Sequence, residues 1–279
     1  MPLCRKGRDM SDPLLQVRDL CTHFTTRQPG LRAVKKVIRA VDGISFDIAP
    51  GEVLSLVGES GCGKSTVGRT LTRLEKSTSG SALFEGREIL DLSPGAFRPL
   101  RRDIQMIFQD PFASLNPRLT IAQTLGETLF IHGLASSWAD ANRMIAETLE
   151  LVGMDPKVMS RHPHEFSGGQ RQRIGIARVM ILKPKLVIAD EAVSALDVSI
   201  QAQVLNLIKR LQRDSGVAML FISHDLGVVR HISDRVAVML AGKIVEVGTK
   251  MQIFEDPAHA YTRKLLSAIP RVAQRAGAA

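Results

Sequence analysis

The chain has 279 residues, of which 44% are hydrophobic and 23% charged, and this ordinary globular composition excludes a disordered or collagen-like protein. A chain of this length buries roughly 70–75% of its unfolded surface, so it needs neither disulfides nor a structural metal in order to fold. No apolar run reaches the roughly 18 residues of a membrane-spanning helix. The three cysteines are odd in number and widely spaced, which favours a reducing compartment, the cytoplasm, and argues against a zinc site.

The net charge of +9 is concentrated at the two ends of the chain. Residues 1–40 and 263–279 hold the excess of Lys and Arg, whereas the body between them is nearly neutral. A DNA-binding body usually carries a basic face, so we expect no nucleic-acid partner. The basic ends are expected to be solvated tails, and attraction to an anionic membrane or to nucleic acid stays open as the alternative. Residues 1–13 are predicted to be a flexible N-terminus that is not a secretory signal, because no apolar run follows its basic residues.

Strands and helices alternate along most of the chain. Before residue 110, the pattern predicts strands at Leu15–Leu20, Val41–Ile48, Glu52–Val57, Ser81–Phe84 and Ile104–Phe108 and a helix at Lys64–Leu74. An insert at 111–168 is mostly helical, with helices at Ile121–His132 and Ala139–Val152. After it come a helix at Gly169–Leu182, a strand at Leu186–Ala189, a helix at Val198–Ser215, a strand at Ala218–Ser223 and a hairpin of Val236–Leu240 and Lys243–Val247. This order predicts an α/β fold with a largely parallel sheet that the helical insert divides.

A glycine-rich loop lies between the predicted strand Glu52–Val57 and the helix that follows it. It fits the pattern G-x-x-x-x-G-K-[ST], whose backbone N–H groups cradle phosphate oxygens at the start of a helix. Lys64 is expected to reach the β- and γ-phosphates of a nucleotide, and the Ser65 hydroxyl to ligate Mg²⁺. The predicted ATP-binding residues of this loop are Gly58, Glu59, Ser60, Gly61, Cys62, Gly63, Lys64, Ser65 and Thr66.

Two carboxylates, Asp190 and Glu191, follow the apolar strand at 186–189. In open α/β folds, ligands bind at the carboxyl ends of the strands, where both acids are expected to lie. Asp190 suits Mg²⁺ coordination, and Glu191 suits activation of the attacking water as a general base. The acids lie far downstream of the phosphate loop, and this separation is too long for one βαβ unit and requires the inserted helical segment.

A third motif, Ser167-Gly-Gly-Gln170, opens a helix. Ser167 is a good N-cap, and the two glycines leave the helix end accessible to an anion. Three further features accompany these motifs. Gln109 follows the strand at 104–108, and His224 follows the strand at 218–223. The segment Ser194-Ala-Leu-Asp197 comes shortly after the acidic pair. In this order, the motifs resemble those of the ATP-binding subunits of ABC transporters over about residues 14–270.

The resemblance implies a fold and a division of the chain. It implies a P-loop NTPase core with an N-terminal antiparallel β subdomain and an inserted helical subdomain. Residues 14–110 would form the first part of the core with the β subdomain, and 111–168 the helical subdomain. Residues 169–250 would complete the core, and 251–279 would form the C-terminal tail.

The resemblance also implies roles for individual residues. Two such subunits would pair head to tail, with ATP between the phosphate loop of one and Ser167, Gly168, Gly169 and Gln170 of the other. Gln109 would contact Mg²⁺ and the attacking water, and sense the permease. His224 would contact the γ-phosphate and hold Glu191 and the water in line. Asp197 would lie at the dimer interface, and Phe24 is the best match for the aromatic residue that stacks on adenine.

Three segments resemble the importer branch for oligopeptides and dipeptides, which also serves nickel, glutathione and related solutes. They are residues 58–63, residues 108–117 and the tail, with its two pieces 256–262 and 268–270. Ala192 and Ala260 stand where the family usually has proline. Some relatives hold an iron–sulfur centre in a cysteine cluster after this tail, but residues 271–279 contain no cysteine, so no cluster is expected.

The implied function is that of the ATP-hydrolysing subunit of an importer, peripheral on the cytoplasmic face of the inner membrane. Its implied partners are two permease subunits, a second ATP-binding subunit and an extracytoplasmic solute-binding protein. The sequence leaves open which cargo is transported and whether the two ATP-binding subunits form a homodimer or a heterodimer. The alternative is a soluble ABC-type ATPase of DNA repair or translation, although the chain has neither sustained heptads nor a second cassette. A P-loop kinase is a further alternative, but it is disfavoured because such an enzyme would need neither Ser167–Gln170 nor His224.

Overall fold

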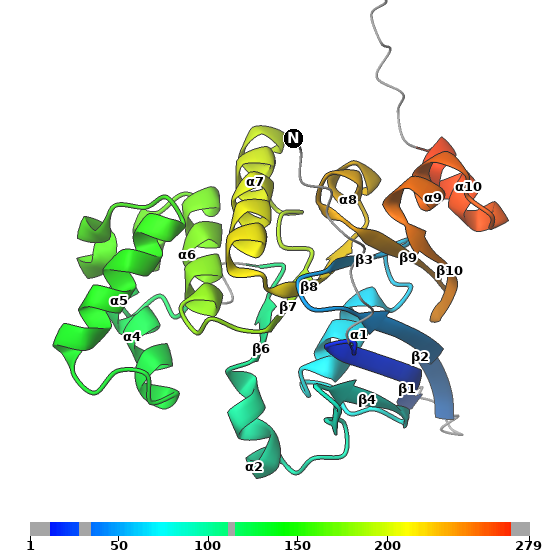
Figure 1. The fold of residues 1–279 in the computed structure, drawn as a ribbon, viewed down its shortest axis with the longest axis horizontal. Helices are drawn as coiled ribbons and strands as arrows, with labels where there is room; N and C mark the ends of the chain where they lie inside the picture. Colours follow the sequence, from blue (N-terminus) through cyan, green and yellow to red (C-terminus); the bar gives the residue numbers. More distant parts are fainter. Residues whose placement is uncertain (1–11, 28–34, 111–114, 269–279) are drawn as a thin grey trace, which may run out of the picture.

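The computed structural model describes residues 12–27, 35–110 and 115–268 (Figure 1). Most of the predicted flexible N-terminus and residues 271–279 lie outside the described residues. A mixed sheet occupies the centre of the molecule, with a group of helices on one side and a smaller antiparallel sheet on the other. In the described part of the chain, no helix has both the length and the apolar character needed to cross a membrane.

The central sheet has six strands in the order β10-β9-β3-β8-β7-β6. Neighbouring strands pair in parallel from β9 to β6, and only β10 pairs antiparallel, with β9. Every residue of β3, β7 and β8 is buried, as expected for parallel strands that are covered on both faces. The strands are β3 (Val53–Val57), β6 (Ile104–Ile107), β7 (Leu186–Asp190), β8 (Ala218–Ser223), β9 (Arg235–Leu240) and β10 (Lys243–Thr249). The predicted, largely parallel sheet is therefore confirmed.

The second sheet is antiparallel, with the order β2-β1-β4-β5. It consists of β1 (Leu15–Arg27), β2 (Lys35–Ile48), β4 (Ser79–Phe84) and β5 (Arg87–Glu88). The first two strands are longer than the sequence predicted, because their pairing continues to Arg27 opposite Lys35. Val37 and Ile38 are 54% and 45% exposed there, so this part of the hairpin lacks the alternation of buried and exposed residues that identifies a strand.

The helices fall into three groups along the chain. Early helices are α1 (Lys64–Leu71), α2 (Pro94–Phe97) and the 3-10 helix η1 (Arg98–Arg101). The insert contains α4 (Ile121–Ile131), α5 (Trp138–Leu151), η2 (Pro156–Ser160) and η3 (Pro163–Glu165). Later helices are α6 (Gly168–Met180), α7 (Val198–Ser215), α8 (Leu226–Ile232), α9 (Lys250–Glu255) and α10 (Ala260–Ser267). Helix α1 ends before its predicted limit, because Arg73 takes a left-handed backbone conformation with φ 60°.

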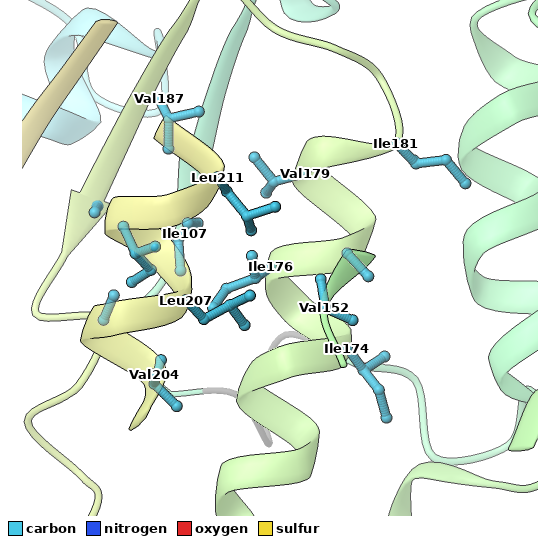
Figure 2. Close-up of a cluster of buried hydrophobic side chains, with 14 of the residues drawn as sticks. Ile107, Val152, Ile174, Ile176, Val179, Ile181, Val187, Val204, Leu207 and Leu211 are labelled. Atoms are coloured by element: carbon cyan, nitrogen blue, oxygen red, sulfur yellow. The ribbon is translucent and has the colours of Figure 1, made fainter. Parts of the chain in front are cut away.

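Alternate residues of the central strands face two separate hydrophobic cores. In one core, Val187 and Phe221 pack with the apolar faces of α6 and α7 and with the helices of the insert (Figure 2). In the other, Ile188 and Leu220 pack with α1 and the antiparallel sheet. A smaller third core joins α8, α9 and α10 to β3 and β9. The carboxyl ends of β3, β6, β7 and β8 are thereby fixed relative to one another.

Candidate functional site

The glycine-rich loop runs from the end of β3 to the start of α1 and is enclosed by backbone from three other segments. A Cβ atom at Gly58 would lie 2.1 Å from the Met239 carbonyl oxygen, and one at Gly63 would lie 1.9 Å from the Ala40 carbonyl oxygen. Gly63 also has φ 107°, a conformation that favours glycine. The carbonyl oxygen of Cys62 accepts a hydrogen bond of 3.0 Å from the Gly242 N–H. The three segments β2, β9 and the β9–β10 turn therefore hold the loop in one conformation.

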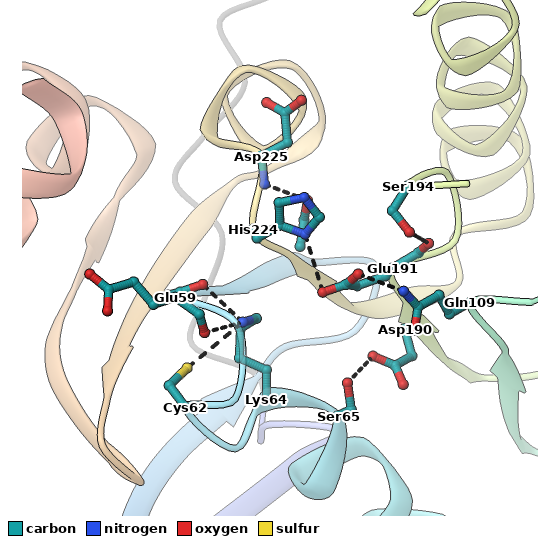
Figure 3. A network of polar contacts seen from close by, with 12 residues as sticks. Glu59, Cys62, Lys64, Ser65, Gln109, Asp190, Glu191, Ser194, His224 and Asp225 are labelled. Carbon is teal, nitrogen blue, oxygen red and sulfur yellow. Dashed lines mark hydrogen bonds and ion pairs between the residues drawn. The ribbon is translucent and has the colours of Figure 1, made fainter. Parts of the chain in front are cut away.

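Lys64 folds back over this loop. Its side-chain ammonium, Nζ, donates to the carbonyl oxygens of Gly58 and Glu59, each at 2.9 Å, and lies 3.7 Å from the Cys62 sulfur atom (Figure 3). The residue is only 4% exposed, and these three partners are neutral. A buried cation with neutral partners at the N-terminus of a helix suits a phosphate group, which adds the missing negative charge. The loop and Lys64 therefore fit a nucleotide phosphate.

Asp190 at the end of β7 faces the start of α1. The Ser65 hydroxyl donates a hydrogen bond of 2.7 Å to an Asp190 oxygen. Asp190 is 3% exposed, and burial raises its pKa, an effect that the hydrogen bond from Ser65 only partly offsets. A divalent cation would stabilise this buried carboxylate, and carboxylate and hydroxyl oxygens are the ligands that Mg²⁺ prefers. The pair therefore fits Mg²⁺.

Glu191 lies between two polar side chains from neighbouring strand ends. Gln109, which follows β6, donates from its amide nitrogen to one Glu191 oxygen at 3.0 Å. His224, which follows β8, lies with Nδ1 3.2 Å from the other Glu191 oxygen (Figure 3). Because a carboxylate only accepts hydrogen bonds, Nδ1 carries the proton in this contact. The three predicted catalytic residues thus meet at one place, beside Asp190.

The backbone of Glu191 is in the left-handed region, with φ 46°. The Glu191 N–H donates to the Ile222 carbonyl oxygen at 3.0 Å, and the Glu191 carbonyl oxygen accepts a hydrogen bond of 3.0 Å from the Ser194 hydroxyl. A non-glycine residue keeps such a conformation only where its surroundings stabilise it, and these residues often lie at functional sites. The turn aims the Glu191 side chain away from the strand and towards Gln109 and His224.

Residues 167–170 form a capped helix start. Ser167 is the N-cap of α6, and it forms a reciprocal capping box with Gln170. A Cβ atom at Gly169 would lie 2.4 Å from Ile200 on α7, so this glycine lets the two helices approach closely. Asp197, the N-cap residue of α7, is exposed and caps nothing with its side chain. No hydrogen bond among the described residues links Ser167, Gln170 or Asp197 to the phosphate loop.

Phe24 lies half-buried on β1, opposite Ile38 of β2. Its stacking on adenine stays a prediction. In the neighbouring residue, His23, the ring atom Nε2 lies 3.3 Å from an Asp42 carboxylate oxygen. Cys21, His23 and Asp42 lie close enough together to be considered as a metal site. Asp42 also lies 3.8 Å from both Arg39 and Lys243, however, and these two cations already offset the charge of its carboxylate.

One residue at the site was not predicted from the sequence. The Tyr261 hydroxyl, on the C-terminal helix α10, accepts a hydrogen bond of 3.2 Å from the Glu59 N–H of the phosphate loop. The tail motif at 256–262 indicated a branch of a family, but no sequence signal connected it to the loop. Only the packing of α10 against β3 and β9 brings the two segments together.

The model of the family described as "ABC transporter" matches residues 41–194, which is more than half of the chain. The chain belongs to the ABC transporter family. A second family model, "Oligopeptide/dipeptide transporter, C-terminal region", matches residues 245–278. The predicted resemblance is therefore confirmed both for the family and for the peptide-transporter type of its tail.

Curated relatives of this ABC transporter chain include the glutathione import ATP-binding protein GsiA of Escherichia coli (strain K12), which is 57% identical over 269 residues. That alignment covers 96% of this chain and 43% of the relative. GsiA of Pectobacterium atrosepticum is 55% identical over 260 residues, covering 93% and 42%. The chain thus spans less than half the length of the curated relatives that it matches.

Solved ABC cassettes have the same fold as this chain. The ATP-binding cassette MJ0796, in a dimeric post-hydrolysis state bound to ADP and phosphate, matches with a TM-score of 0.74 and 26% identity. The match covers 85% of this chain and 98% of that one. The cbiO1 protein of Clostridium perfringens, part of an ABC transporter complex, has the same TM-score and identity, covering 94% and 98%. The predicted fold class is therefore confirmed.

Proposed function

We propose that this chain is the ATP-hydrolysing subunit of a membrane ABC importer that energises uptake of peptides or a related small solute. The observation that carries the proposal is the position of Glu191, which Gln109 and His224 hold beside the Ser65–Asp190 pair. A carboxylate held by two donors next to a phosphate and Mg²⁺ site suits activation of water for attack on the γ-phosphate. The match to GsiA, named for glutathione import, supports a peptide-like cargo, since glutathione is a tripeptide.

The chemistry divides among four groups of this chain. The backbone N–H groups of the phosphate loop and Lys64 bind the phosphates of ATP. Ser65, Asp190 and the amide oxygen of Gln109 would hold Mg²⁺, which when bound would offset the charge that develops on the phosphates. Glu191 accepts a proton from the attacking water. His224 keeps the Glu191 carboxylate in place through its Nδ1 proton and contacts the γ-phosphate.

A second copy of the cassette completes the site. Ser167 and Gln170 of one chain use their mutual hydrogen bonds to cap α6, and no hydrogen bond among the described residues joins them to the phosphate loop of their own chain. We propose that they bind the γ-phosphate of ATP on a partner chain, with Phe24 on the adenine and Asp197 at the interface. The dimeric cassette MJ0796 supports this arrangement. ATP then stabilises the dimer, and hydrolysis removes that stabilisation.

A basic cleft suits contact with a permease. It lies between η1 and the end of α4 and is lined by Arg98, Arg101, Arg102 and His132. Burial, followed by the charges of Arg102 and Arg98, lowers the pKa of His132. Asp103 at the base of this cleft directly precedes β6, whose other end leads to Gln109. A permease segment docked in this cleft would thus be connected to the catalytic site through one strand.

Recovery of the tagged chain from solubilised native membranes, followed by mass spectrometry, tests the importer function. We expect two permease chains, together with a second ATP-binding subunit or a second copy of this chain. Arg102→Glu in the cleft is expected to reduce permease recovery, whereas Arg143→Glu on the exposed face of α5 is not. Recovery of ribosomes or DNA-repair proteins in place of permeases would support the soluble alternative.

Ser167→Arg tests the dimer. A bulky cation at the start of α6 is expected to leave ATP binding by the single chain intact and to prevent ATP-dependent dimerisation, measured by light scattering in the presence of ATP and Mg²⁺. The substitution also removes a helix cap, at a cost of about 1 kcal/mol of stability. Ser137→Arg removes an equivalent cap from α5 and is the matched control. Dimerisation of Ser167→Arg at the wild-type ATP concentration would rule out this interface.

A further inference from the structure

The C-terminal helix α10 contacts the phosphate loop at a single polar point. The Tyr261 hydroxyl accepts the Glu59 N–H at 3.2 Å, across a separation of 202 residues along the chain. Glu59 follows the first glycine of the loop, where the backbone leaves β3. A helix of the tail thus reaches the first turn of the nucleotide-binding loop.

The contact acts on the same peptide unit that holds Lys64. The Gly58 carbonyl and the Glu59 N–H belong to one planar peptide group, in which they point in opposite directions. The carbonyl oxygen accepts from Lys64 Nζ at 2.9 Å, and the N–H donates to Tyr261. Rotation of this peptide would break both hydrogen bonds. Tyr261 therefore fixes the orientation of a carbonyl group that positions the Lys64 ammonium.

The tail is firmly attached where it makes this contact. Glu246 of β10 accepts hydrogen bonds from the Ala258 N–H at 2.7 Å, from the His259 N–H at 3.1 Å and from the Thr262 hydroxyl. Burial raises the pKa of Glu246, but these hydrogen bonds outweigh it and hold the pKa below its ordinary value. Thr262 is 2% exposed, directly beside Tyr261. The start of α10 is therefore fixed to the central sheet.

The ring of Tyr261 packs against the third hydrophobic core, to which the last residue of β3 also belongs. Tyr261, Phe254 and Leu265 pack against a buried group that includes Val57, the last residue of β3, and Val238 of β9. This apolar contact does not involve the hydroxyl group, and it positions α10 near the loop even when the hydroxyl is removed. The hydroxyl adds a directional contact, so its effect can be separated from that of the ring.

We propose that Tyr261 is a positioning residue for ATP binding, through which the C-terminal tail orients the Gly58–Glu59 peptide and Lys64. The inference rests on the proposed ATPase function of the same loop. Because one hydrogen bond of ordinary strength is involved, its loss is expected to raise KM and Kd for ATP by roughly three- to tenfold. The kcat at saturating ATP should not change, because Tyr261 bonds to the phosphate loop and not to Glu191.

Tyr261→Phe tests the proposal, because it removes the hydroxyl and keeps the ring. Ser267→Ala is the matched control, since it removes a hydroxyl from the same helix, and within the described part of the chain this hydroxyl bonds only to the Lys264 carbonyl. The measurements are the Kd for a fluorescent ATP analogue, the steady-state KM and kcat, and the melting temperature. Tyr261 is the single tyrosine of the chain, so a change in tyrosine absorbance on adding ATP reports on this contact directly.

The outcomes separate the inference from the proposed function. A raised Kd and KM with unchanged kcat, in Tyr261→Phe and not in Ser267→Ala, supports the positioning role. If wild-type protein binds the analogue and Tyr261→Phe binds it equally well, the positioning role is wrong and the proposed function stands. A purely structural role would lower the melting temperature and the active fraction with KM unchanged, which would also overturn the inference. If wild-type protein binds no ATP, the proposed function itself fails.

Discussion

Replacement of Glu191 by glutamine is expected to lower kcat for ATP hydrolysis by about 10²- to 10⁴-fold, the usual contribution of a general base. The amide has nearly the same shape but cannot accept a proton from water. ATP binding should remain at the wild-type level, because Lys64 and the loop backbone do not contact Glu191. The ATP-bound dimer should therefore accumulate, which gel filtration in the presence of ATP and Mg²⁺ measures alongside phosphate release.

Glu147→Gln is the matched control for this substitution. Glu147 is an exposed residue of α5, paired with Arg143 at 3.2 Å, so its neutralisation should leave hydrolysis unchanged. Hydrolysis by Glu191→Gln at the wild-type rate would exclude Glu191 as the base. The contacts from Gln109 and His224 would then serve only to fix the turn after β7.

Replacement of Lys64 by alanine is expected to weaken ATP binding by at least about 100-fold, so that none is detected at micromolar ATP. The ammonium lies at the helix start, and charge-assisted hydrogen bonds to phosphate contribute about 1.5–3 kcal/mol each. Binding of a fluorescent ATP analogue measures the loss. The buried Gly58 carbonyl and the Glu59 carbonyl also lose this donor, so the melting temperature is expected to fall.

Lys185→Ala controls for the loss of a lysine charge. Lys185 pairs with Glu85 at 2.8 Å on the surface, and both side chains are about half exposed. This variant should bind ATP like the wild type. Tight ATP binding by Lys64→Ala in a folded protein would mean that the glycine-rich loop does not receive the phosphates.

The parts of the site that the sequence predicted are those that depend on local geometry. The loop between β3 and α1 could be recognised because its glycines and Lys64 occupy fixed positions in one continuous segment. The place of Asp190 and Glu191 followed from the apolar strand before them, since strand ends share one edge of a parallel sheet. The meeting of Gln109, Glu191 and His224 was predicted only through the family, because spacing alone does not give the strand order β6-β7-β8.

The features that escaped prediction depend on long-range packing. Tyr261 reaches Glu59 because α9 and α10 cover β3 and β9, and a short helix leaves little periodic signal. The extension of β1 and β2 is stabilised by cross-strand pairing on an exposed surface, where hydrophobic alternation is weak. The left-handed Glu191 has no sequence signature, since a non-glycine residue there is stabilised by hydrogen bonds to neighbouring segments.

The central position of β3 has a consequence for folding during synthesis. Both neighbours of β3 come much later in the chain, with Val53 opposite Met219 and Leu54 opposite Arg235. Until those residues leave the ribosome, a largely apolar strand has two open edges, which is the kind of segment that associates with other chains. The glycine-rich loop also acquires its surroundings only when the Met239 region arrives. Nascent chains should therefore depend on chaperones and gain ATP affinity only after the Met239 region has been synthesised.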